Sequence, residues 1–155
     1  MIQRIQTVYL LLSAGLFFSL LFLPLAVFQS GDGLYEFLVS GLQTTTAEME
    51  LVYPTWSLLT INAIIILLCF VSIFMYKRRI LQIRICVYNT LLMIGFCLLT
   101  GFYFLQFKQS PDLLDLKINF RVWTSFPVIA IILNYLAIRN IGADETMIRS
   151  LERLR

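Results

Sequence analysis

Histidine is absent from the 155-residue sequence, and only 14% of its residues carry charge. Without histidine the chain cannot form a bis-histidine haem site, a histidine zinc site or an imidazole acid–base pair. Glycine-rich phosphate loops and the G-x-S-x-G elbow of serine hydrolases are missing as well. These absences predict a protein that is not an enzyme, with no catalytic residue, no metal site and no cofactor.

Charge is missing above all from four long stretches that together hold 93 residues: 5–31, 51–76, 85–107 and 122–138. Hydrophobic residues make up 59% of the chain, and its mean hydropathy of +0.84 is too high for a small soluble domain. A helix that crosses a bilayer needs about 20 apolar residues. Pro24 is expected to kink the first such helix near its outer end. We therefore predict a single domain, residues 1–155, that is an all-α membrane protein: a four-transmembrane-helix bundle with spans 5–28, 55–76, 85–107 and 122–138.

The basic residues are unevenly placed along the chain. Nine of the 12 Lys and Arg precede the first span or lie in the link 77–84 and the tail 139–155. The positive-inside rule then places both termini and that link in the cytoplasm, and the loops 29–54 and 108–121 outside. We expect the lipid bilayer as a partner, with anionic lipid attracted to the basic side, and no nucleic acid, because no aromatic side chains interleave the arginines. The side chains expected to contact headgroups or a cytoplasmic partner are Lys77, Arg78, Arg79, Arg84, Arg149, Arg153 and Arg155.

The two outer loops contain three stretches in which apolar and polar residues alternate. They are 34–39, 47–53 and 115–121, and a period of two is typical of a half-buried strand. Residues 40–46, between the first two stretches, include a glycine and a threonine run and are expected to form a loop. We predict a small outer β-sheet of two or three strands resting on the bundle, with an irregular loop on the headgroups as the alternative.

One asparagine falls in each of the last three spans: Asn62, Asn89 and Asn134. Asn89 and Asn134 are expected at similar depth, where they could pair across a helix interface. An amide in lipid needs a hydrogen-bond partner, so we expect interhelical polar contacts in preference to a ligand site. The three cysteines of the second and third spans lack C-x-x-C spacing and are expected to be buried filler.

Small residues mark two of the spans. Gly15 and Ser19 form a small-xxx-small pair in the first span. Gly95 and Gly101 leave two positions of the third span without a side chain. Such residues let helix backbones approach closely, either inside the bundle or against another membrane protein. The sequence leaves both uses open.

The tail after Gly142 has an amphipathic pattern. Asp144 is a plausible N-cap, and apolar residues then recur with helical spacing at 147, 148, 151 and 154. This predicts a short cytoplasmic amphipathic C-terminal helix. It would lie on the membrane surface, with docking to a cytosolic partner as the alternative.

A family resemblance is carried by the start of the chain, the link and the tail: MIQRIQTVYL at 1–10, YKRRILQIR at 76–84, LAIRNI at 136–141, DE at 144–145 and RSLERLR at 149–155. On these residues the chain resembles a Bacteroidota family of small four-helix integral membrane proteins of unknown function. The resemblance covers the whole length and implies a cell inner membrane protein with four helices. It implies no activity, ligand or catalytic residue.

Two functions remain as expectations. The first is a non-enzymatic accessory or scaffold subunit of a larger inner-membrane complex, in protein export, secretion or respiration, with other membrane subunits as partners. The alternative is a module that binds a lipid or a small hydrophobe in a groove beside the glycines of the first and third helices. A transporter is least favoured, because no Asp, Glu, Lys or Arg lies inside a predicted span.

Overall fold

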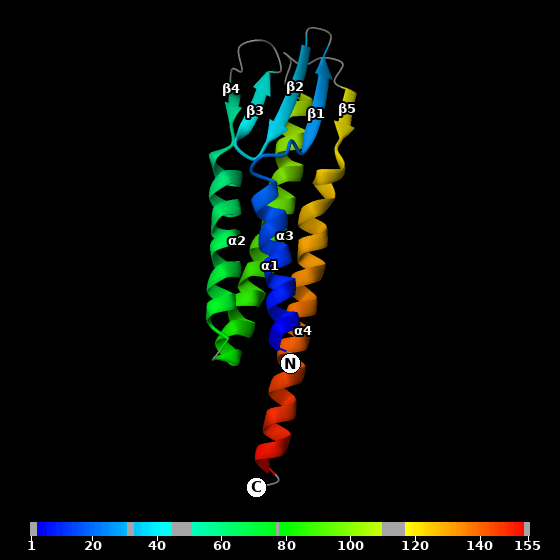
Figure 1. The fold of residues 1–155 in the computed structure, drawn as a ribbon. Coiled ribbons are helices and arrows are strands. Elements are labelled where there is room, and N and C mark those ends of the chain that lie inside the picture. Colours follow the sequence, from blue (N-terminus) through cyan, green and yellow to red (C-terminus); the bar gives the residue numbers. More distant parts are fainter. Residues whose placement is uncertain (1–2, 31–32, 45–50, 77, 110–116, 154–155) are drawn as a thin grey trace.

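The computed structural model describes residues 3–30, 33–44, 51–76, 78–109 and 117–153 (Figure 1). Four helices run along a common axis, and an antiparallel sheet covers one end of them. We call this the sheet end. The N-terminus and the turn between the second and third helices lie at the opposite end, the terminal end. The helices are α1 (Gln3–Ser19), α2 (Trp56–Phe74), α3 (Arg79–Gln109) and α4 (Phe126–Arg153), with a 3₁₀ turn, η2 (Val122–Ser125), before the last.

The helices form a closed ring. α1 packs against α2 and α4, and α3 packs against the same two neighbours from the other side. Across the middle of the bundle, the side chains of Phe17 and Phe96 meet edge to face and join α1 to α3. Their ring centroids are 5.4 Å apart. The predicted mostly helical fold with a small antiparallel sheet is therefore confirmed.

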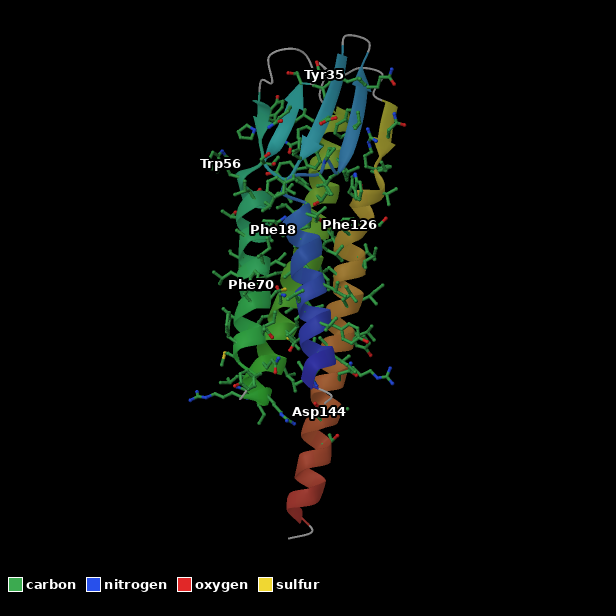
Figure 2. All side chains as sticks on the ribbon, viewed as in Figure 1. Phe18, Tyr35, Trp56, Phe70, Phe126 and Asp144 are labelled. Atoms are coloured by element: carbon green, nitrogen blue, oxygen red, sulfur yellow. The ribbon has the colours of Figure 1, made fainter. Side chains whose placement is uncertain are left out.

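Three helices are long and apolar enough to cross a membrane: Trp56–Phe74, Arg79–Phe107 and Val122–Asp144. Only 28% of the most apolar stretch of each is buried inside the protein, so most of their apolar side chains face outward. Leu67 and Leu98 are 60% and 71% exposed, and Figure 2 shows Phe70 pointing away from the bundle. Water-soluble monomers rarely expose an apolar surface of this extent, and lipid is the solvent that suits it.

The predicted first span, 5–28, is wrong in its second half. α1 ends at Ser19, which leaves 17 residues, about 25 Å of helix. Tight turns follow, in which the Leu21 and Phe22 N–H groups bond the carbonyls of Phe18 and Ser19 at 3.2 and 3.1 Å. Pro24 has no N–H and disfavours helix at the residue before it, so it stops the helix; it does not kink it as predicted.

The sheet has five strands, more than the two or three predicted. Two internal strands were missed: one is the end of the presumed first span, and the other lies in the expected loop 40–46. The remaining three match the alternating stretches, although 47–50 and 115–116 lie outside the described residues. In spatial order the strands are β4 (Leu51–Pro54), β3 (Gly41–Thr44), β2 (Gly33–Leu38), β1 (Ala26–Ser30) and β5 (Lys117–Phe120).

The inner face of the sheet packs on the last turns of α3, which runs beyond the predicted span 85–107 at both ends. Phe104 lies 6.0 Å from Phe28 and 5.2 Å from Phe37, and Phe107 lies 6.1 and 5.5 Å from the same two rings. Phe28 and Phe37 come from β1 and β2 and are almost fully buried. The aromatic rings of three elements therefore fix the sheet to the helix.

Two threonine hydroxyls tie the sheet to the starts of the helices. Thr55, just before α2, is fully buried, and its Oγ1 donates to the Val39 carbonyl at 2.9 Å. Thr124, in η2, donates to the Leu25 carbonyl, which also accepts the N–H of Arg121 at 3.3 Å. The sheet is thus held at both sides of the bundle by bonds from helix entry points.

α4 is one continuous helix, and the prediction of a separate C-terminal helix is wrong. The helix passes through Gly142 and Asp144 to Arg153, because one glycine in a long helix interior costs only about 1 kcal/mol. Figure 1 shows its last turns running straight past the ends of the other helices. Asp144 is not an N-cap. Its Oδ2 accepts a hydrogen bond from Gln6 Nε2 at 2.7 Å (Figure 2 labels Asp144).

Candidate functional site

The predicted basic contact residues occupy different surroundings at the terminal end. The link is shorter than predicted, because α3 already begins at Arg79. Arg79 is half-buried, whereas Arg78 and Arg84 are exposed. Arg149 and Arg153 lie in the last turns of α4, where side chains are not described, and Lys77 and Arg155 lie outside the described residues. Arg79 is therefore the basic side chain around which a site can be described.

Arg79 lines a cleft of about 440 Å³ between the start of α1, the end of α2 and the start of α3. Two glutamines and a threonine contribute amide and hydroxyl groups, and the α2 side is apolar. The lining residues are Gln6, Thr7, Ile73, Phe74, Tyr76, Arg79 and Gln82. A cationic and amide-bearing wall therefore faces an apolar wall within one cleft.

Two of the polar lining groups have no partner in the part of the chain that the structure describes. Gln82 is only 4% exposed, and its side-chain amide makes no hydrogen bond there. The Arg79 guanidinium likewise makes no ion pair or hydrogen bond with a described residue. The two residues are three apart on α3, which places them on the same face of its first turns. A ligand in the cleft that accepts a hydrogen bond from this amide therefore gains affinity.

The start of α3 adds a favourable field for negative charge. Arg79 is the first residue of a helix of 31 residues. The first N–H groups of a helix have no intrahelical acceptor, and the aligned peptide dipoles leave partial positive charge there. No acidic residue is among the described lining residues, and Asp144 Oδ2 is bonded by Gln6, which is one of them. The cleft thus combines one unpaired cation with a helix N-terminus.

The predicted interhelical asparagines lie inside the bundle, but Asn89 and Asn134 do not bond each other. Asn134 Nδ2 donates to the Cys86 carbonyl at 2.9 Å and to Thr90 Oγ1 at 2.8 Å, which joins α4 to α3. Asn89 Nδ2 donates to the sulfur of Cys69 at 3.1 Å, which joins α3 to α2. The Oδ1 atoms of both asparagines have no described partner.

Asn62 differs from the other two asparagines. It is fully buried, and neither its Nδ2 nor its Oδ1 has a hydrogen-bond partner among the described residues. Asn62 is not among the residues that line the cleft at the terminal end. The expectation of an interhelical contact is therefore not met at this position.

Two of the three cysteines, Cys69 and Cys86, take part in the polar interior and are more than filler, whereas Cys97 is half-buried. Ser13 Oγ lies 3.5 Å from the sulfur of Cys69, and Ser72 Oγ lies 3.0 Å from that of Cys86. Within the described ranges no group of three metal-ligating side chains occurs. The thiols and hydroxyls thus link helix to helix at the same level as the asparagines.

The small residues do not mediate close packing inside the bundle. A Cβ built on Gly15, Gly95 or Gly101 would meet nothing within 4 Å. Ser19 Oγ bonds the Leu16 carbonyl of its own helix at 2.7 Å. The close-approach interpretation of these residues therefore fails for the helices of this chain, and the cleft lies elsewhere.

Sequence reasoning missed the two glutamines and Asp144 as members of one site. The i, i+3 spacing of Arg79 and Gln82 at the start of an apolar helix was an available signal. The contact between Gln6 and Asp144 was not, because 138 positions separate them in the sequence. Only the packing of α1 against α4 brings these two side chains together.

Comparison with known proteins gives a family and no activity. Searches of curated proteins and of solved structures found no match to the chain. A family model covers residues 2–154, nearly the whole sequence. The chain therefore belongs to the family described as a domain of unknown function, DUF4293.

Proposed function

We propose that the protein is a non-enzymatic accessory or scaffold subunit of a larger assembly in the cell inner membrane, with both termini in the cytoplasm. The observation that carries the proposal is the continuity of α4. The helix leaves the bundle without a bend and extends nine residues past Asp144, about 14 Å further. A helix in this direction leads away from the membrane and does not lie along its surface.

A projecting helical segment of this length needs something to pack against. Short helices are marginal in water unless tertiary contacts cover an apolar face. The sequence at 147–154 carries an amphipathic repeat, and such repeats dock in apolar grooves of partner proteins. Docking to a partner subunit therefore replaces the membrane-surface expectation for the tail.

The test is site-specific photocrosslinking in native membranes combined with native sizing. Leu151→Arg disrupts the apolar repeat, and Ser150→Arg is its matched control, because it places the same charge one residue away. We expect one adduct protein that persists in Ser150→Arg and disappears in Leu151→Arg, with a matching loss of particle mass. A wild-type chain that runs alone at 18.0 kDa plus detergent, without adducts, would overturn the scaffold role.

Orientation has its own test. Gln29 is exposed in β1 and Arg78 is exposed in the α2–α3 turn, at opposite ends of the molecule. Gln29→Cys is expected to react with an impermeant thiol reagent from outside, and Arg78→Cys only after the membrane is opened. The reverse pattern would contradict the proposed topology.

A second candidate function, binding of a lipid or small hydrophobe, is favoured by the cleft. The cleft offers an apolar wall beside unpaired polar groups. It lies at the terminal end between α1, α2 and α3, not beside Gly15, Gly95 and Gly101 where the sequence suggested a groove. Mass spectrometry of the purified protein tests this function, which fails if no amphiphile is retained.

A further inference from the structure

We propose that the cleft at the terminal end binds the phosphate headgroup of an anionic phospholipid, with Arg79 and Gln82 as its ligands. The inference rests on the second candidate function and is independent of the scaffold role. It assigns a chemical class to the occupant, and this class follows from three properties of the cleft: its charge, its unpaired amide and its opening onto apolar surface.

The charge of the cleft suits a phosphate. A guanidinium binds phosphate oxygens with charge-assisted hydrogen bonds, often two at a time. The Arg79 guanidinium has no described partner, and it stands at a helix N-terminus, where anions bind favourably. Arg78, next to it in the chain, is exposed and adds positive potential at the rim.

The Gln82 side chain is the second, independent observation. This side chain lines the cleft and is only 4% exposed, yet it makes no hydrogen bond with a described residue. Its N–H groups can donate to a phosphate oxygen that Arg79 also holds, since both residues lie on one face of α3. The residue as a whole is nine-tenths buried, so its amide can reach a headgroup only within the cleft that it lines.

The acid near the cleft does not oppose this binding directly. Asp144 is the carboxylate of the facing helix α4, and its Oδ2 accepts the hydrogen bond of Gln6 Nε2 at 2.7 Å. Gln6 is itself a lining residue, whereas Asp144 is not among the lining residues. The bond also fixes the orientation of the Gln6 amide at the wall of the cleft.

The apolar wall distinguishes a phospholipid from a free phosphate ion. Ile73 and Phe74 line the cleft, and Phe74 is 78% exposed. One turn further along α2, Phe70 is also exposed, and Leu11 is exposed one turn beyond Thr7 on α1. The cleft therefore opens onto a lipid-facing surface along which an acyl chain can lie, with the headgroup at the helix ends.

The experiment uses the full chain in nanodiscs of phosphatidylcholine that contain a minor share of phosphatidylglycerol. Native mass spectrometry counts the lipids that stay bound after the disc is removed. We expect wild type to retain one phosphatidylglycerol. Arg79→Gln and Gln82→Leu should lower that retention roughly tenfold, the loss expected for one hydrogen bond to a charged group.

Two further variants separate the site from general effects. Arg84→Gln removes a charge from the same helix at an exposed position outside the cleft and is expected to leave retention unchanged. Ile73→Trp fills the cleft without changing charge and is expected to abolish retention. The unfolding midpoint of each variant shows whether the bundle is intact. If Arg84→Gln and Arg79→Gln lost lipid retention equally, surface charge alone would account for the retention, and the proposal would be overturned.

The remaining arms distinguish the source of the phosphate and the two functions. Inorganic phosphate added in excess should not displace the lipid; binding of phosphate alone that depends on Arg79 would replace the lipid proposal. Retention of phosphatidylcholine as strong as that of phosphatidylglycerol, and sensitive to Ile73→Trp, would refute the anionic headgroup while leaving hydrophobe binding intact. Retention of no lipid at all would refute both, and the crosslinking test of the scaffold role would still stand.

Discussion

At the sheet end the interior of the bundle is packed with phenylalanine rings, whereas toward the terminal end it contains amides, hydroxyls and thiols. Phe17, Phe28, Phe37 and Phe96 are each at most 1% exposed and belong to one large apolar cluster. The apolar cluster of the other end is small, with Leu10 at its centre, and the cleft lies beside it. The large aromatic cluster and the cleft therefore lie at opposite ends of one bundle.

The difference has a physical cause. Aromatic rings gain stability from every contact, so they favour an interior without gaps. Amides and thiols gain stability only where a partner lies at the right distance, and the Oδ1 atoms of Asn89 and Asn134 have no partner among the described residues. An end built from such groups can exchange partners, and this is what a ligand site requires.

Among the variants that test this difference between the two ends, Phe37→Ala is expected to have the largest effect on stability. Phe37 contacts three rings from β1 and α3, and removing a fully buried phenylalanine costs about 3–5 kcal/mol. We expect the free energy of unfolding in micelles to fall by that amount. Phe102→Ala, at a 60% exposed position of α3, is the control and should change little. Equal losses would show that the sheet end is not the stable core.

A second prediction contrasts two asparagines of the interior. Asn134→Leu removes two interhelical hydrogen bonds and should lower the free energy of unfolding by about 1–2 kcal/mol. Asn62→Leu removes an amide with no described partner and should be neutral or raise it by about 1 kcal/mol. Chemical unfolding of both variants under the same conditions measures the difference. A loss at Asn62 would reveal that its amide is bonded in the membrane.

The junction between sheet and bundle gives a smaller effect. Thr55→Val keeps the shape of the side chain but removes the hydrogen bond to the Val39 carbonyl. We expect a loss of about 1 kcal/mol, measured as a lower thermal midpoint. Thr60→Val, an exposed position where the hydroxyl bonds only its own helix, is the matched control. A larger loss at Thr60 would speak against the importance of the junction.

The smallest predicted effect is a gain. Gly15→Ala and Gly95→Ala add a methyl group where nothing lies within 4 Å, and alanine favours helix over glycine by about 0.5–1 kcal/mol. Both should raise the thermal midpoint of the purified protein. A loss in native membranes but not in detergent would show that another protein packs against that helix face.

The sequence predicted the elements whose signal is local and missed those whose signal depends on contacts. Charge-free stretches located α2 and α3, and alternation located β2, β4 and β5. β1 was missed because its apolar residues continue the run of the first helix, and a buried strand cannot be told from a helix by hydrophobicity alone. Pro24 indicates the end of α1, whereas only a kink was predicted at this position.

The candidate site was predictable only in part. Arg79 was named as a headgroup contact because of the positive-inside pattern. Gln6 gave no signal, since a single glutamine near a helix end is ordinary until packing buries it, whereas the i, i+3 spacing of Arg79 and Gln82 was a signal in the sequence. The continuity of α4 was not predictable either, because Gly142 and Asp144 resemble a helix end in the sequence. In the structure, packing against α1 and the bond between Gln6 and Asp144 support a continuous helix through these residues.

One consequence follows from α3 ending inside the sheet. The helix has 31 residues and measures about 46 Å, against a hydrocarbon layer of about 30 Å. Its far end packs on β1 and β2 through Phe104 and Phe107, so the sheet moves with this helix. In the proposed transmembrane arrangement, a helix longer than the hydrocarbon layer tilts to fit it. A thicker bilayer is then expected to bring α3 more upright and to turn the sheet with it.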